Sequence, residues 1–166
     1  MGVKLMKTEQ QIVSSLLHRL VDEHPEFEHE TDAHKYISLE ALKKDIRENL
    51  EMILNTRLGY FDAPKGCDEI KRSILNYGIP DFTRQYYSLR QNQQELCNTI
   101  KATINHFESR LQQVKVTLSE TDAEINRSFF IRIESVINIK PEPKQAVFES
   151  NLDIVRYQFS FDEEKS

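Results

Sequence analysis

The 166-residue chain has the composition of an ordinary globular protein, with 39% hydrophobic and 30% charged residues. Its formal net charge of -5 argues against a nucleic acid partner, because binding to the phosphate backbone needs clustered Lys and Arg side chains. No apolar stretch reaches the roughly 20 residues that cross a bilayer, and the first residues lack the apolar segment of a signal peptide, so we expect a cytoplasmic protein without direct membrane insertion.

Two amphipathic helices are predicted in the first third of the chain. Over residues 8–23, one apolar stripe at helical spacing ends before Pro25 and consists of Ile12, Leu16, Leu17, Leu20 and Val21. After a polar stretch rich in histidine, Ser38 can N-cap a longer helix that reaches Leu54. The apolar face of this second helix consists of Leu39, Leu42, Ile46, Leu50, Ile53 and Leu54.

A connector follows over residues 55–82, where helical periodicity fails and Gly and Pro recur. We expect one short helix within it, at residues 68–75. Structureless loops beyond about 12 to 15 residues are uncommon, and this segment carries several aromatic and aliphatic residues. The pattern therefore favours an ordered connector with a role of its own.

The last part of the chain changes from helical periodicity to alternation. A third helix is predicted over residues 91–110, followed by strands at residues 114–118, 129–134 and 153–161, with a shorter strand at 145–149. Helices first and strands last indicate an α+β fold, in which N-terminal helices pack on a C-terminal, mainly antiparallel β-sheet of three to four strands. We expect one domain over 1–166, made of an N-terminal helix and loop (1–37), a helical part (38–110), the sheet (111–161) and a tail (162–166).

The sequence lacks the common signatures of catalysis and of metal or cofactor binding. No Gly-rich phosphate loop and no Gly-x-Ser-x-Gly motif occurs. His24, His29 and His34 recur every five residues, which does not place them on one helix face, so we expect no metal. Cys67 and Cys97 are not in a Cys-x-x-Cys pair and are expected to be ordinary thiols.

Four short strings in order along the chain resemble one family. Residues 15–20 read Ser-Leu-Leu-His-Arg-Leu, residues 50–57 read Leu-Glu-Met-Ile-Leu-Asn-Thr-Arg, residues 76–81 read Asn-Tyr-Gly-Ile-Pro-Asp, and residues 108–111 read Glu-Ser-Arg-Leu. Together they resemble TssE, the small baseplate component of type VI secretion systems, and the related baseplate wedge proteins of contractile-tailed phages. The chain departs from the family at Ser109, where Pro is usual, and so loses a fixed φ at the end of the third helix.

The resemblance implies a structural protein and not an enzyme. Its expected partners are the other wedge subunits, of TssF, TssG and TssK type, and contractile sheath subunits of TssB and TssC type. The implied location is the cytoplasmic side, docked at a baseplate associated with the inner membrane. Sheath subunits would add an extended arm to a sheet edge, for which the strand at residues 153–161 is the first candidate.

Six residues are candidate partner contacts: Glu108, Arg110, Arg57, Asp81, Arg156 and Tyr157. For Glu108 and Arg110 an internal salt bridge is an equal alternative to a partner contact. We expect that reversing either charge blocks sheath assembly and leaves the isolated domain folded. Residues 55–57 could simply end a helix, with Asn55 in a left-handed cap, and Asp81 could cap the segment after it.

Two other functions remain open at this point. One is a peptidoglycan hydrolase that uses Glu108 with a second carboxylate such as Glu134, since such enzymes need a carboxylate pair. The other is a soluble regulatory adaptor.

Overall fold

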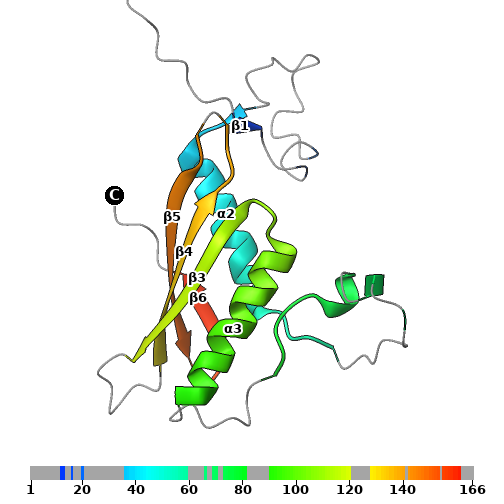
Figure 1. Cartoon of the computed structure of the whole chain (residues 1–166), viewed down its shortest axis with the longest axis vertical. Coiled ribbons are helices and arrows are strands. Elements are labelled where there is room, and N and C mark those ends of the chain that lie inside the picture. The colour runs from blue at the N-terminus through cyan, green and yellow to red at the C-terminus, as the bar shows by residue number, and fades with distance from the viewer. Residues whose placement is uncertain are drawn as a thin grey trace, which may run out of the picture.

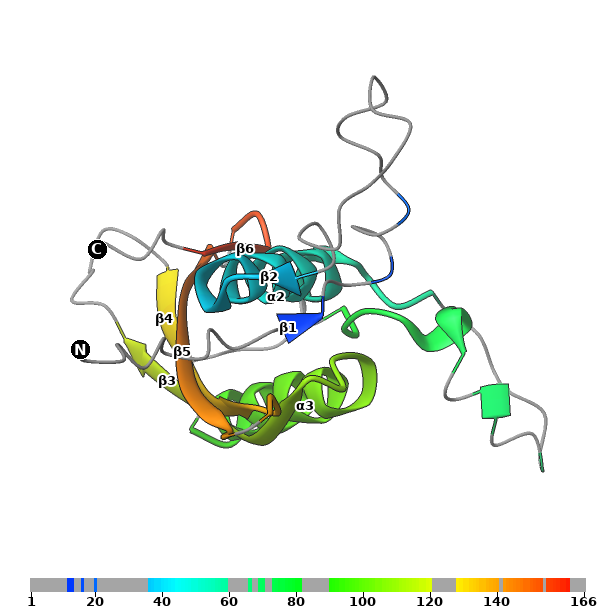
Figure 2. The same cartoon turned by 90° about the horizontal axis from the view of Figure 1, so that it is seen from above.

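Two long helices lie on one side of a curved antiparallel sheet (Figures 1 and 2). The computed structural model describes residues 12–13, 16, 20, 36–59, 66, 69–70, 73–81, 90–120, 128–140, 142–153 and 155–161. The sheet has four strands in the order β3-β4-β5-β6, so that β3 and β6 are its edges. The bounds of its strands are Leu111–Glu120 (β3), Ser128–Ile137 (β4), Lys144–Asp153 (β5) and Gln158–Phe161 (β6). This arrangement confirms the predicted α+β fold.

Alternation along the strands separates a core face from an outer face. In β4, Ile131 and Ile133 are fully buried, whereas Arg132 between them is exposed. The strand predicted at 145–149 is longer than expected, because β5 pairs with β4 along its whole length. The strand predicted at 153–161 is wrong in its first half: residues 155–157 form a turn, in which the side chain of Val155 is 73% exposed.

The second predicted helix is confirmed as α2 (Leu39–Asn55). The Ser38 hydroxyl caps it by accepting a hydrogen bond from the Ala41 N–H at 3.0 Å. One face of α2 is in the core, and its buried residues are Leu42, Ile46, Leu50, Ile53 and Leu54.

The third helix is α3 (Arg90–Phe107), and it ends three residues before the predicted bound. The Glu108 N–H still makes a helical hydrogen bond, to the Ile104 carbonyl at 2.8 Å. Two later backbone amides bond to Glu108. The Arg110 N–H donates to the Glu108 carboxylate, and the Leu111 N–H donates to the Glu108 backbone carbonyl. Glu108 and Arg110 therefore lie in the turn between α3 and β3, and Leu111 begins the sheet.

The helix predicted at residues 8–23 is wrong at Ile12 and Val13. These two residues form β1 (Ile12–Val13), which pairs with β2 (Tyr36–Ile37). Ile12 is buried in the core, so tertiary pairing overrides the helical pattern there. Leu16 and Leu20 are helical but 70% and 72% exposed, and the rest of the segment lies outside the described residues.

The end of the connector, at Ile79, is hydrogen-bonded to the residues that directly follow α2. The Leu58 N–H donates to the Ile79 carbonyl at 2.8 Å, and the Ile79 N–H donates to the Thr56 carbonyl at 2.9 Å. Gly78 has φ +105°, and a Cβ there would lie 2.3 Å from the Thr56 carbonyl oxygen. In place of the short helix expected at 68–75, residues 69–70 are in 3-10 conformation and Ile74–Asn76 form a 3-10 helix, η3. Residues 68, 71 and 72 lie outside the described residues.

Candidate functional site

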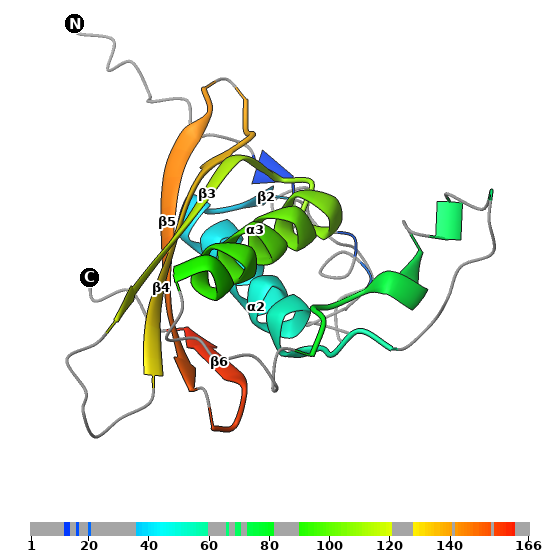
Figure 3. The same ribbon diagram turned by 60° about the horizontal axis from the view of Figure 1, so that its bottom comes forward.

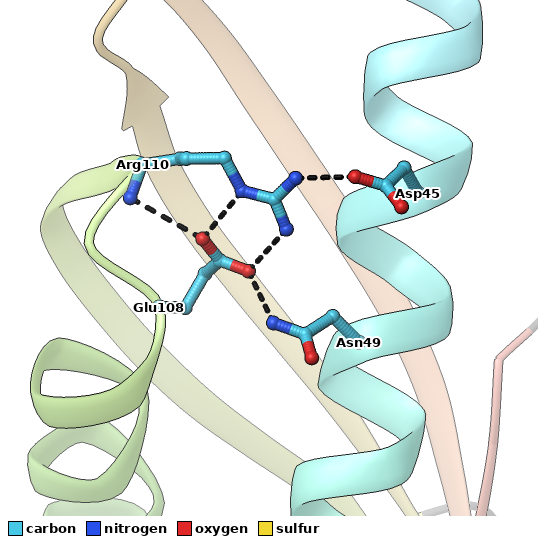
Figure 4. Close-up of polar contacts among 4 residues, drawn as sticks. All are labelled: Asp45, Asn49, Glu108 and Arg110. Atoms are coloured by element: carbon cyan, nitrogen blue, oxygen red, sulfur yellow. Dashed lines mark hydrogen bonds and ion pairs between the residues drawn. The ribbon is translucent and has the colours of Figure 1, made fainter. Parts of the chain in front are cut away.

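Four polar residues from α2 and the α3–β3 turn form one network, which we call the Glu108 cluster: Asp45, Asn49, Glu108 and Arg110 (Figure 4). The Glu108 carboxylate is 2% exposed and accepts hydrogen bonds from Arg110 Nε at 2.7 Å, Arg110 Nη2 at 2.6 Å and Asn49 Nδ2 at 2.6 Å. Arg110 Nη1 is also bound by Asp45 on α2. The internal salt bridge, one of the two alternatives for this pair, is therefore formed.

The cluster keeps Glu108 ionised. Burial alone would raise the pKa of this carboxyl, but the hydrogen bonds from Arg110 and Asn49 and the positive charge of Arg110 outweigh burial, and the pKa lies below its usual value. The bonds to Glu108 likewise raise the pKa of Arg110 against the effect of burial. A buried ion pair of this kind is not an exposed pair, so the expectation that a charge reversal would leave the fold intact no longer holds.

This geometry does not suit a carboxylate pair for glycoside hydrolysis. A general acid needs a raised pKa, whereas the pKa of Glu108 is lowered. Glu134 lies on the opposite, outer face of the sheet, where it pairs with Lys115 and Arg132. The bonds of the cluster join α2 to the turn that precedes β3.

A second group of predicted residues meets at the other end of α2. Arg57, Asp81 and Tyr157 line one cavity of about 20 Å³, together with Asn55 and Phe159 and five apolar neighbours. Such a volume holds about one water molecule and no substrate. Arg57 and Asp81 are exposed at its rim, and Tyr157 is half-buried with a positive φ of 52°. The structure thus brings three of the six predicted contacts together.

Arg156 is not part of either group. Its side chain is 78% exposed, and Nε lies 3.9 Å from Asp153 Oδ2. The backbone N–H of Arg156 also donates to Asp153 Oδ1 at 3.1 Å, which fixes the turn before β6.

Asn55 has a role that the sequence did not reveal. Its amide Nδ2 donates to the Phe159 carbonyl at 2.9 Å, and its Oδ1 accepts from the Phe159 N–H at 2.8 Å. The predicted left-handed cap is wrong: Thr56 ends the helix with φ -84° and bonds back to Met52. An Asn at the last position of a helix does not by itself indicate a tertiary contact, and the partner of Asn55 is 104 residues away in the sequence.

The remaining features concern metal ligands, thiols and membrane-spanning helices. No group of three His, Cys, Asp or Glu side chains among the described residues could hold a metal ion. Cys97 is a half-buried free thiol, and burial raises its pKa. His24, His29, His34 and Cys67 lie outside the described residues. None of the described helices has the length and apolar character needed to cross a bilayer.

The chain is similar to solved structures, among them the two that follow, and to a curated protein. One structure is the baseplate complex from the type VI secretion system, with 18% identity, coverage of 68% of this chain and 94% of that one, and a TM-score of 0.47. The other is a candidate tail lysozyme from Geobacter sulfurreducens, with 18% identity, coverage of 78% and 99%, and a TM-score of 0.48.

The curated relative is the ATP-dependent RNA helicase CshA of Limosilactobacillus reuteri, 34% identical over 89 residues. These residues are 51% of this chain and 18% of that protein, so the chain spans less than a fifth of the relative's length. The family comparison covers more: residues 40–142 match the family of the baseplate wedge protein gp25. This range includes α2 from its second residue, α3, β3, β4 and the whole Glu108 cluster. The chain belongs to this baseplate wedge family.

Proposed function

We propose that the chain is a structural wedge subunit in the baseplate of a contractile, type VI secretion machine, where it joins other baseplate subunits and starts sheath polymerisation. The observation that carries this proposal is membership of the baseplate wedge family over residues 40–142. The geometry supports it, because both helices lie on one side of the sheet (Figure 2), and side chains of the opposite face such as Lys115 and Arg132 are exposed.

The proposed partners are wedge subunits of TssF, TssG and TssK type and sheath subunits of TssB and TssC type, on the cytoplasmic side of the inner membrane. Four residues are the proposed contacts: Arg57, Asp81, Arg156 and Tyr157. The first three are exposed, and Tyr157 is half-buried beside β6. In this proposal Glu108 and Arg110 do not contact partners. They fix the position of α2 relative to the start of β3, and partners bind the surface formed by these elements.

Affinity purification of the tagged chain from cells that make the whole machine tests the first half of the proposal. Wedge subunits should co-purify with the wild-type chain. A matched variant, Arg57→Glu with Asp81→Arg, keeps the net charge and should lose them while eluting as a folded protein. Recovery of soluble signalling proteins in place of baseplate subunits would favour the regulatory adaptor.

A turbidity assay on purified peptidoglycan separates the structural role from hydrolysis. The chain should leave the suspension unchanged. Clearing that disappears in Glu108→Gln but persists in a matched variant, Glu95→Gln on the exposed side of α3, would contradict the proposal.

A further inference from the structure

The last residues of the connector and α3 form the two walls of a groove of about 620 Å³. The segment that follows η3 returns to the helices (Figure 3) and runs antiparallel to α3. Tyr77 packs on Phe107, at the C-terminal end of α3, with ring centroids 5.1 Å apart. Pro80 lies nearer the other end of the helix, where it lines a small cavity together with Leu96. The groove therefore extends along α3 and not across it.

Regular spacing on both walls gives the groove its length. On the connector wall the lining residues are Asn76, Gly78 and Pro80, which alternate as residues on one face of an extended chain do. On the α3 wall they form two rows at four-residue spacing, Gln94, Asn98 and Ala102 in one and Glu95, Thr99 and Thr103 in the other. Eight residues of α-helix are about 12 Å long, and an extended chain covers that length with about four residues. The groove thus fits a short extended segment.

The groove is shallow and almost uncharged. Its lining residues Gly78 and Thr103 are buried, whereas Gln94 and Asn98 at its rim are exposed. Among the described residues that line it, Glu95 has the one charged side chain, although 30% of the whole chain is charged. A pocket for a small molecule covers most of the surface of its ligand. Walls as exposed as these suit instead a polypeptide segment that enters at one end and leaves at the other.

The carboxamides of Gln94 and Asn98 are spaced for binding to a peptide backbone. They lie about 6 Å apart along the axis of α3, and the groups on one side of an extended chain repeat every two residues, about 6.6 Å. Each carboxamide has donors and an acceptor, so it can bind both the N–H and the C=O of one residue. Asn55 binds Phe159 in this way within the protein, at 2.9 and 2.8 Å. Neither Gln94 nor Asn98 bonds through its carboxamide to another described residue.

We propose that the groove binds an extended segment of a neighbouring wedge subunit. Gln94 and Asn98 hold the backbone of this segment, and Glu95 pairs with a Lys or Arg side chain that the segment carries. Side chains of α3 make these bonds, so no edge of the sheet takes part. The proposal rests on the proposed function and adds the place at which a wedge subunit binds.

The position and charge of the groove favour a wedge subunit with a basic segment as its occupant. Pro80 lines both the groove and the small cavity at whose rim Arg57 and Asp81 are exposed, so the groove continues the surface of the proposed contacts. Glu95 is the carboxylate of an otherwise neutral groove, so one cation on the segment would complement it and an anion there would be repelled.

Binding of purified wedge subunits to the full chain tests the proposal. Gln94→Ala with Asn98→Ala should weaken binding by about tenfold or more, because the two carboxamides that hold the backbone are lost. The matched control, Gln112→Ala with Asn105→Ala, removes the same two residue types at exposed positions outside the groove and should leave binding unchanged. Equal binding by both variants would overturn the assignment of the groove and leave the proposed function standing. Failure of the wild-type chain to bind would overturn both.

Cross-linking in cells that make the whole machine identifies the occupant of the groove. A photoreactive residue in place of Ala102 should cross-link to a wedge subunit, at a segment that contains Lys or Arg. The same residue in place of Ala41, at an exposed position of α2, should not reach that segment. A cross-link from position 102 to a second copy of the chain, to a sheath subunit or to no protein would overturn the proposal.

Discussion

Breaking the Glu108 cluster should remove much of the stability of the protein. In Arg110→Glu, the 2% exposed carboxylate of Glu108 loses its main partner and gains a like charge beside it. Removal of one partner from a buried ion pair costs about 3–5 kcal/mol, and Arg110, whose side chain is 29% exposed, is close enough to buried for this range to apply. Domains of this size have about 5–15 kcal/mol in total, so the free energy of unfolding should fall by about a fifth or more.

Urea unfolding at neutral pH, followed by far-UV circular dichroism, measures this loss. The matched control is Lys44→Glu, which reverses a charge in the exposed Lys44–Glu48 pair of α2, 3.9 Å apart with side chains 72% and 60% exposed. That control should change the free energy of unfolding by less than about 1 kcal/mol. If Arg110→Glu lowers the free energy of unfolding no more than the control does, the Glu108 cluster does not stabilise the fold and our account of it is wrong.

Three further changes have definite expected outcomes. Leu50→Ala, at a fully buried position of α2, should cost about 2–5 kcal/mol in urea melts, and Met52→Ala, at a 62% exposed position of the same helix, less than about 0.5 kcal/mol. Equal losses would mean that the helix is rotated. Gly78→Ala should cost more than about 1 kcal/mol, because φ is +105° and the new Cβ meets the Thr56 backbone; a neutral thermal melt would refute that strain. The pKa of Glu108 is lowered in the folded state, so its contribution to stability is present above the unfolded pKa of about 4.3 and is lost as pH falls through the folded pKa. Glu108→Gln should therefore flatten the acid limb of stability against pH, and an unchanged limb would contradict the lowered pKa.

Features set by neighbouring residues could be predicted from the sequence. The phase and N-cap of α2 follow from apolar spacing and from Ser38, which bonds three residues along the chain. The alternation of β4, with Ile131 and Ile133 inwards and Arg132 outwards, is equally local. Both predictions are confirmed, because the buried face of each element follows the spacing of its apolar residues in the sequence.

Contacts between distant segments could not be predicted. The string Glu108-Ser109-Arg110 marked a charged turn, but Asn49 is 59 residues from Glu108 and Asp45 is 65 residues from Arg110. Only the packing of α2 against the turn shows that the pair is buried. The Asn55–Phe159 contact was missed for the same reason, and it occupies the N–H and C=O of Phe159 in the last strand.

Sheath imaging in cells tests the central claim most directly. Cells that lack this chain and carry a fluorescent sheath subunit should show diffuse fluorescence, and the wild-type chain supplied from a plasmid should restore extended sheaths. The folded variant Arg57→Glu with Asp81→Arg, which reverses two of the proposed contacts, should restore few or none. Normal extension and contraction of sheaths in cells without the chain would contradict its assignment as the subunit on which the sheath begins.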